Sequence, residues 1–195
     1  MILSSIQIIL FNDLLYATDK ERFDLMKNRK MLIFSDSHGR TAAMKEILDM
    51  HRNSLDCVAF LGDGAADFEL LRSYCDFPCD FISVRGNCDI GCDEIPQERF
   101  IDFYGYKIYM THGHNFGVKS GLERLEYKCR ELCADVGLFG HTHYRNETYL
   151  PAENGYEKQL ILFNPGSISK PNDGKPSFGL LTLSGGSILL SHGMY

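Results

Sequence analysis

Residues 31–63 read MLIFSDSHGRTAAMKEILDMHRNSLDCVAFLGD, and the order of their apolar runs sets the architecture. The runs at 31–34 and 57–61 are short and apolar, which is typical of buried strands. Between them, residues 40–51 place five side chains on one face of a helix: Ala43, Met44, Ile47, Leu48 and His51. Strand, helix and strand in this order predict parallel strands joined by a crossover helix.

The alternation continues toward the C-terminus and then changes character. Residues 67–75 predict a second helix with Phe68, Leu71, Tyr74 and Cys75 on one side, and 81–84 predict a third strand. Further strands are predicted at 107–111, 136–139, 159–163, 178–183 and 187–190, with one helix marked by Leu122, Leu125, Cys129 and Leu132. We therefore expect an α/β fold in which two packed sheets carry outer helices.

Length, composition and net charge exclude some classes of protein. The 195 residues suit one domain, and 44% hydrophobic with 24% charged residues excludes a disordered chain. Lys and Arg number 20 against 26 Asp and Glu, a formal charge of -6, and no basic run is present. The chain is therefore not expected to wrap nucleic acid, although metal ions could still make a site locally positive for a small anion.

The N-terminal residues look unlike the rest. We expect residues 1–30 to be an N-terminal extension and residues 31–195 to be the domain, because the regular pattern starts at Met31. Residues 1–25 are either a misread upstream segment or an appended helix that packs on the domain or on a partner subunit. Its apolar stretch at 6–16 is interrupted by polar residues, so we expect no signal peptide and no membrane span.

Seven cysteines include three pairs at C-x3-C spacing. Zinc ribbons and redox sites usually use C-x2-C, so this spacing is weak evidence for a metal. Cys129 and Cys133 are expected to share the buried face of a helix. We interpret the seven as reduced, mostly structural thiols of a cytoplasmic protein.

Polar side chains that can do chemistry follow five successive predicted strands. They lie in the segments Ser35-Asp36-Ser37-His38-Gly39, Gly62-Asp63-Gly64, Gly86-Asn87-Cys88-Asp89, Thr111-His112-Gly113-His114 and Gly140-His141-Thr142-His143. Parallel strands bring their carboxyl ends to one edge of a sheet, so these loops are expected to converge there. Any one of them could arise by chance, but their ordered recurrence predicts a metal centre.

The donor types indicate which metal. Seven candidates combine carboxylates, imidazoles and an amide oxygen: Asp36, His38, Asp63, Asn87, His112, His141 and His143. Such a set suits Mn, Fe, Zn or Ni and is too large for one tetrahedral ion, so it fits two ions sharing a bridging carboxylate. Two divalent cations with two carboxylates and a hydroxide leave net positive charge, which favours phosphate ester hydrolysis.

In order, these motifs resemble the calcineurin-like metallophosphoesterase superfamily, whose pattern is D-x-H, G-D, G-N-H-[DE], H and G-H-x-H. The short spacings, the G-N-C-D variant and Asn164-Pro165-Gly166-Ser167 are similar to the small YfcE-like phosphodiesterase subgroup. The resemblance implies a four-layer α/β/β/α sandwich of two mixed β-sheets flanked by helices.

The resemblance also implies roles for individual residues. One metal would be held by Asp36, His38 and His143, the other by Asn87, His112 and His141, with Asp63 bridging. A metal-bridging hydroxide would attack phosphorus, and Asn87, Cys88, Asp89 and His114 would complete the catalytic set. Two divalent ions are expected, Mn2+ first, with Ni2+, Fe2+, Zn2+ and Mg2+ as alternatives.

Three positions leave alternatives open. Cys88 stands where most members carry a histidine that contacts phosphate, so it either weakens leaving-group assistance or is an inert thiol. His114 is either a residue that supports a ligand or a substrate contact. Asn164 either orients the edge of the site or forms a plain turn.

The leading functional prediction is a phosphodiesterase acting on a small phosphodiester. A phosphomonoesterase acting on nucleotides or phosphoproteins is the first alternative, and a non-catalytic interaction module, as in the retromer branch of the fold, is the second. No membrane partner is expected, and the chain could assemble as a homodimer or homotetramer.

Overall fold

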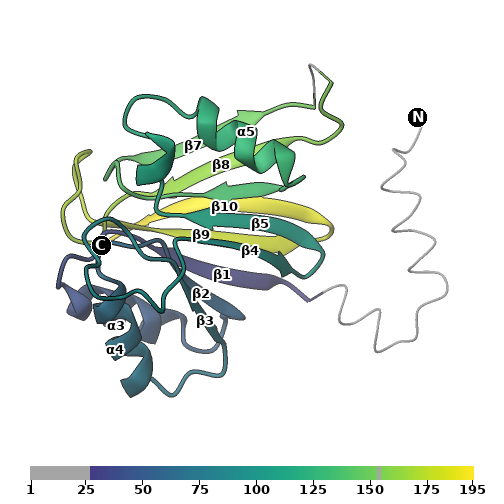
Figure 1. Cartoon of the computed structure of the whole chain (residues 1–195). Coiled ribbons are helices and arrows are strands. Elements are labelled where there is room, and N and C mark those ends of the chain that lie inside the picture. The colour runs from purple at the N-terminus through teal and green to yellow at the C-terminus, as the bar shows by residue number, and fades with distance from the viewer. Residues whose placement is uncertain (1–26, 153–154) are drawn as a thin grey trace.

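The computed structural model describes residues 27–152 and 155–195, which form two five-stranded β-sheets with helices on their outer faces (Figure 1). The expectations for residues 1–26 lie outside the described residues. The first strand begins at Arg29 rather than Met31, because Arg29 and Lys30 already pair with a C-terminal strand.

The first sheet has the order β10-β9-β1-β2-β3. Its strands are β1 (Arg29–Phe34), β2 (Cys57–Phe60), β3 (Asp80–Ser83), β9 (Ser177–Ser184) and β10 (Ser187–Met194). β1, β2 and β3 run parallel, whereas β9 is antiparallel to β1 and to β10. The predicted β-α-β-α-β unit is therefore confirmed.

The second sheet has the order β4-β5-β6-β8-β7. Its strands are β4 (Glu98–Phe103), β5 (Tyr106–Thr111), β6 (Val136–Leu138), β7 (Arg145–Leu150) and β8 (Leu160–Pro165). β5, β6 and β8 run parallel, and the edge strands β4 and β7 are antiparallel. β4 and β7 lack the continuous apolar run of a buried strand, which is why the sequence pattern does not predict them as strands.

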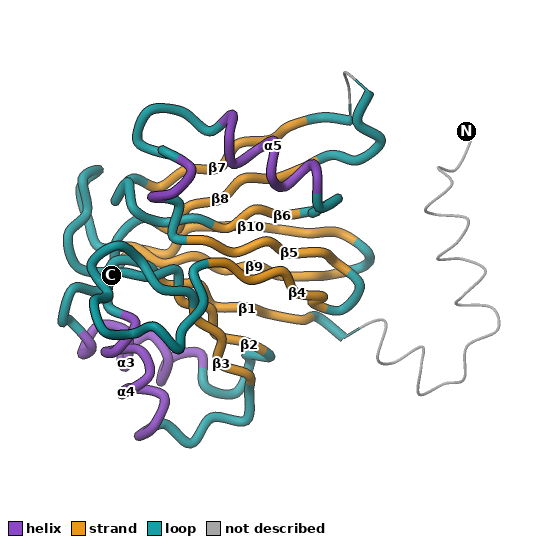
Figure 2. The backbone as a smooth tube through the Cα atoms, in the orientation of Figure 1, coloured by secondary structure: helices purple, strands orange, loops and turns teal. Residues whose placement is uncertain are grey.

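Three hydrophobic cores separate four layers, which confirms the predicted sandwich (Figure 2). Met31 and Ile33 of β1 point into the core between the sheets, while Leu32 and Phe34 point toward the helices. The helices are α3 (Thr41–His51) and α4 (Ala65–Tyr74) over the first sheet, α5 (Glu123–Glu131) over the second, and the short 3-10 helix η1 (His114–Phe116).

Two side-chain predictions on the helices are wrong. Tyr74 ends α4 and is 80% exposed, because the chain turns away there. Cys129 is buried as expected, but Cys133 lies beyond the end of α5 and is exposed. All seven cysteines are free thiols. Within residues 27–152 and 155–195, no helix has the length and apolar character needed to cross a bilayer.

Candidate metal centre

The five predicted loops converge, but they come from two sheets rather than one. Asp36 and His38 follow β1, Asp63 follows β2, and Asn87 follows β3, all in the first sheet. The loops after β5 and β6 of the second sheet carry His112, His141 and His143. The carboxyl ends of parallel strands in both sheets thus face one shared edge.

Backbone strain is concentrated in these loops. Seven described residues other than glycine have positive φ, and five of them are proposed ligands: Asp36 (55°), His38 (42°), Asp63 (59°), His141 (67°) and His143 (60°). Each such residue costs about 1–3 kcal/mol, which the surrounding structure has to offset. Strain of this kind is typical of functional sites, where it aims side chains at a ligand.

Two glycines let the first-sheet loops approach each other. A Cβ on Gly62 would lie 2.5 Å from the backbone nitrogen of Gly86, and a Cβ on Gly86 would lie 2.2 Å from Oδ1 of Asp63. Gly62 also has a φ of 94°, which disfavours other residues. The loop after β3 can therefore come close to Asp63 only because both positions lack a side chain.

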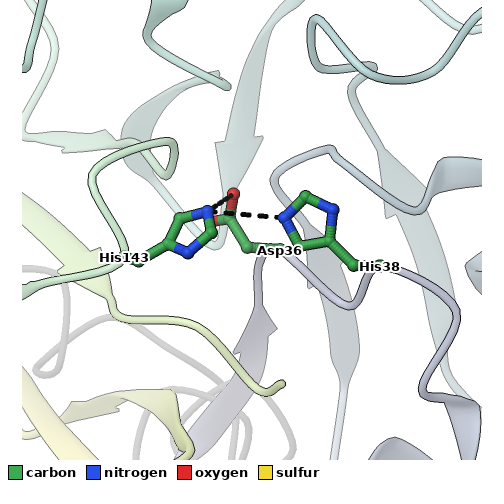
Figure 3. Close-up of side chains that lie close together, drawn as sticks. All are labelled: Asp36, His38 and His143. Atoms are coloured by element: carbon green, nitrogen blue, oxygen red, sulfur yellow. Dashed lines mark hydrogen bonds and ion pairs between the residues drawn. The ribbon is translucent and has the colours of Figure 1, made fainter. Parts of the chain in front are cut away.

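The first ligand group is Asp36, His38 and His143, whose donor atoms all lie within 4.8 Å of one another (Figure 3). His143 Nε2 is 3.1 Å from Asp36 Oδ1 and 3.4 Å from His38 Nε2. Asp36 is fully buried, and His38 and His143 are partly exposed. The group therefore has a buried anionic base and an open side.

The second ligand group is Asp63, His112 and His141, also within 4.8 Å. His112 Nε2 lies 3.4 Å from Asp63 Oδ2 and 3.2 Å from His141 Nδ1. The two groups adjoin, because His112 Nε2 is 4.0 Å from Asp36 Oδ1 and the donor atoms of Asp63 and His38 also lie within 4.8 Å.

Backbone carbonyls orient two of the imidazoles. Nδ1 of His112 lies 2.7 Å from the Leu61 carbonyl, and Nδ1 of His143 lies 2.7 Å from the Lys170 carbonyl. A carbonyl can only accept, so each Nδ1 carries the proton and donates it. Each Nε2 lone pair then faces the carboxylates, as in histidines that ligate metals.

This geometry fits cations. An Nε2 lone pair facing a carboxylate oxygen is repulsive unless a proton or a metal ion lies between them. Burial lowers the pKa of His112, but Asp63 and Asp36 outweigh it and raise the pKa overall. The hydrogen bond with Asp36 likewise raises the pKa of His143. Asp36 Oδ1 is buried, and the described residues offer it no hydrogen-bond donor unless His143 Nε2, 3.1 Å away, carries a proton, which leaves this oxygen available as a ligand.

Burial and neighbouring charges also shift the pKa values of His141, His38 and Asp63. Burial and the neighbouring His112 lower the pKa of His141 to about 4, and burial also lowers the pKa of His38. Burial opposes ionisation of Asp63, but His112 and the Cys88 backbone N–H hold its pKa below the usual range. At neutral pH, His38 and His141 are therefore neutral donors and Asp63 is a carboxylate.

Asp36 and Asp89 are held by hydrogen bonds that sequence reasoning did not identify. Asp36 Oδ2 accepts from Ser35 Oγ at 2.5 Å and from the His141 N–H at 3.2 Å, and the Asp36 carbonyl accepts from two further serines, Ser167 and Ser169. The buried Asp89 carboxylate accepts four backbone N–H groups at 2.7–2.8 Å, from Asp63, Gly64, Ala65 and Gly86. Asp89 thus fastens the Asp63 loop to its own loop.

Asn87, Cys88 and His114 lie around the ligand groups. Asn87 is exposed, and its amide donates to Cys88 Sγ at 3.3 Å. Cys88 Sγ lies within 4.8 Å of donor atoms of His38 and Asp63, and its pKa is raised to about 11 by burial and by Asp63. The His114 ring centroid lies 5.5 Å from that of His112.

Asn164 both forms a turn and supports the edge of the site, the two alternatives that its sequence motif left open. Its Oδ1 accepts from the Gly166 N–H at 2.9 Å, as in a turn. Its Nδ2 donates to the Gly140 carbonyl at 2.8 Å and to Thr142 Oγ1 at 3.1 Å. Buried Asn164 therefore supports the loop that carries His141 and His143.

The comparisons with known proteins agree with this geometry. Residues 30–186 match the model of the calcineurin-like phosphoesterase superfamily domain. The probable metallophosphoesterase YsnB of Bacillus subtilis is 32% identical over 162 residues, which cover 78% of this chain and 83% of YsnB. The phosphodiesterase YfcE of Escherichia coli K12 is 37% identical over 76 residues, covering 38% of this chain and 34% of YfcE.

Solved structures share the fold. A predicted phosphoesterase from Streptococcus pneumoniae TIGR4 superimposes with a TM-score of 0.70 at 25% identity, covering 87% of this chain and 91% of that chain. Vacuolar Protein Sorting 29 from Cryptosporidium parvum superimposes with a TM-score of 0.63 at 19% identity, covering 86% and 98%. The second likeness concerns the fold alone.

Proposed function

The chain belongs to the calcineurin-like phosphoesterase superfamily, and on that basis we propose that it is a dinuclear metal-dependent phosphodiesterase acting on small phosphodiesters. The observation that carries the proposal is the position of Asp63. Its carboxylate lies within ligand distance of His38 on one side and of His112 and His141 on the other. One carboxylate between two imidazole groups is the arrangement that a bridging ligand needs.

In this proposal Asp36, His38 and His143 hold one ion, Asn87, His112 and His141 hold the other, and Asp63 bridges. Bound divalent ions supply a hydroxide nucleophile at neutral pH and positive charge for the phosphate. The chain's own residues fix the donors: Leu61 and Lys170 set the imidazole tautomers, and Asp89 holds the Asp63 loop. Mn2+ is the proposed ion, because carboxylate, imidazole and amide donors accept it readily.

Cys88 supports the preference for diesters. A monoester is a dianion near neutral pH and gains from a cationic side chain beside the phosphate, whereas a thiol with a raised pKa stays neutral. Asp89 is proposed as a positioning residue rather than a substrate contact, since the residue is 8% exposed and its carboxylate is engaged by backbone N–H groups. His114 and Asn87 remain proposed contacts around the phosphate.

The testing experiment is a matrix of metals against two substrates, bis-p-nitrophenyl phosphate and p-nitrophenyl phosphate. The expected result is metal-dependent hydrolysis with the diester preferred and Mn2+ the best of Mn2+, Ni2+, Fe2+, Zn2+ and Mg2+. A preference for p-nitrophenyl phosphate would instead assign a phosphomonoesterase. Purified protein that binds no metal and hydrolyses neither ester would assign a non-catalytic interaction module.

The proposal also covers the cellular location and the oligomeric state. Seven free thiols suit the reducing cytoplasm, which we propose as the location. Self-association as a homodimer or homotetramer is proposed as well, and light scattering of the purified protein measures it directly.

A further inference from the structure

We infer that a cavity beside the metal centre binds the organic group of the phosphate ester, and that this group is a flat ring system of about nucleoside size. The inference rests on the proposed function for the position of the phosphate. The cavity has a volume of about 360 Å³, within the usual size range of small-molecule sites. Its walls are Val118, Lys119, Leu122, Phe139, Thr142, Tyr144, Arg145, Asn146 and Asn172.

The cavity shares its walls with the ligand loops. Thr142 stands between the ligands His141 and His143, and Asn172 donates from its backbone to the His143 carbonyl at 2.9 Å. Val118 packs against Gly113, the residue after His112, where an added Cβ would lie 2.9 Å from it. None of the proposed ligands lines the cavity itself, so its place beside the centre follows from these shared loops, along which a group attached to the phosphate would extend.

The walls suit a flat ring. Val118 and Phe139 are buried apolar residues, and Tyr144 lines the cavity and is 53% exposed, which leaves its ring available for stacking. Asp173 holds the Arg145 guanidinium in place, accepting from Nε at 2.9 Å on its carboxylate and from the second amino group at 3.3 Å on its carbonyl. A fixed planar guanidinium also stacks well on ring systems.

Two amides offer polar groups to the heteroatoms of such a ring. Asn146 Oδ1 accepts from Thr148 Oγ1 at 3.0 Å, and Asn172 Nδ2 donates to the Thr142 carbonyl at 2.9 Å. In the described part of the chain, no partner accompanies the Asn146 amide nitrogen or the Asn172 amide oxygen. One donor and one acceptor beside the apolar side chains of Val118 and Phe139 can hydrogen-bond the heteroatoms of a ring and so fix its orientation.

Lys119 links the cavity to the metal centre electrostatically. Arg145 is neutralised by Asp173, so the ammonium of Lys119 is the positive charge of the walls that no described carboxylate pairs with. Lys119 follows Val118, which packs against Gly113 beside the proposed ligand His112. Its position suits the anionic end of an ester whose ring lies in the cavity.

The test compares adenosine 5′-monophosphate with methyl phosphate as ligands of the Mn2+-loaded protein. Dissociation constants come from calorimetry, and inhibition constants come from competition with bis-p-nitrophenyl phosphate. The nucleotide is expected to bind about tenfold more tightly than methyl phosphate, because ring burial adds to the same phosphate contact. Tyr144→Ala is expected to reduce this preference about fivefold through lost stacking.

Further variants separate the cavity from the rest of the site. Asn146→Trp fills the cavity and is expected to abolish the preference while methyl phosphate still binds. Lys119→Gln is expected to weaken both ligands by a similar factor. Tyr149 lies on β7, just after Tyr144 along the chain, is exposed and does not line the cavity, so Tyr149→Ala is the matched control for Tyr144→Ala and should change nothing.

Equal affinities in the unaltered protein would overturn the inference, as would a preference that survives in both Tyr144→Ala and Asn146→Trp. Metal content and far-ultraviolet circular dichroism show whether each variant is folded, and Tyr144→Ala decides alone if Asn146→Trp is not. The outcome is separate from that of the proposed function. Preferential nucleotide binding without diester hydrolysis would keep the cavity assignment and reject the phosphodiesterase.

Discussion

The loops of the two sheets contribute different chemistry to the metal centre. Both proposed carboxylate ligands, Asp36 and Asp63, come from the first sheet. Three of the four imidazoles, His112, His141 and His143, come from the second. One side brings both carboxylates and the other brings three of the four imidazoles, so the proposed centre exists only where the two sheets meet.

Each sheet also holds the ligands of the other. The Leu61 carbonyl, after β2 of the first sheet, orients His112 of the second sheet. The His141 N–H, after β6 of the second sheet, donates to Asp36 of the first. The core between the sheets thus sets the distances within the centre, and damage on either side is expected to reach both metals.

The largest effect is expected from Asp63→Ala, because Asp63 is the one proposed ligand shared by both ions. Activity should fall by at least about 10³-fold, and both metals should be lost while the fold survives. Metal analysis and the far-ultraviolet spectrum measure this. Two tightly bound metals with near-normal turnover would contradict the bridging role.

The second effect concerns the Asp89 carboxylate, which ties two loops of the first sheet together. Asp89→Asn turns an amide NH2 toward backbone N–H groups that had an acceptor, so we expect a loss of about 3 kcal/mol in the free energy of unfolding. Urea denaturation measures it. Asp93→Asn is the control: that exposed carboxylate pairs with Arg85, and its loss should cost less than about 0.5 kcal/mol.

Asn164→Ala probes the second sheet. Removing its bonds to the Gly140 carbonyl and Thr142 Oγ1 should loosen the loop that carries His141 and His143. We expect metal affinity to fall by about 10–100-fold, as for other residues that support metal ligands. Competition with a chelator measures the affinity. An unchanged affinity would show that this loop does not depend on the buried amide.

The smallest effect is expected at Cys88, on the rim of the first sheet. Cys88→His supplies an acid that titrates near neutral pH, which helps a poor leaving group more than p-nitrophenoxide. The kcat/KM for an alkyl diester should rise about tenfold relative to bis-p-nitrophenyl phosphate. Cys88→Ser is the control. An unchanged ratio with intact metal content would mean that this position does not control leaving-group chemistry.

The sequence allowed the convergence of these loops to be predicted, because residues able to bind a metal recur after apolar runs. It did not assign each loop to one of the two predicted sheets, since the edge strands β4 and β7 are polar and show no clear period. The support of Asp36 by Ser167 and Ser169 was equally hidden, because these residues lie more than a hundred positions away along the chain. Close approaches such as that of Gly62 to Gly86 become visible only in three dimensions.

The role of Asp89 shows the same limit at a single residue. Its place in Gly86-Asn87-Cys88-Asp89 suggests a catalytic carboxylate, and the motif alone contains nothing that separates this from a structural one. Four backbone N–H groups around it make the distinction, and these depend on how two loops fold against each other.

The most direct test of the account titrates metal-free protein with Mn2+ while bis-p-nitrophenyl phosphate hydrolysis is followed. If the carboxylates of the first sheet and the imidazoles of the second build one centre for two ions, activity should rise until two equivalents are bound and then level off. A plateau at one equivalent, or binding of two ions without hydrolysis, would contradict it.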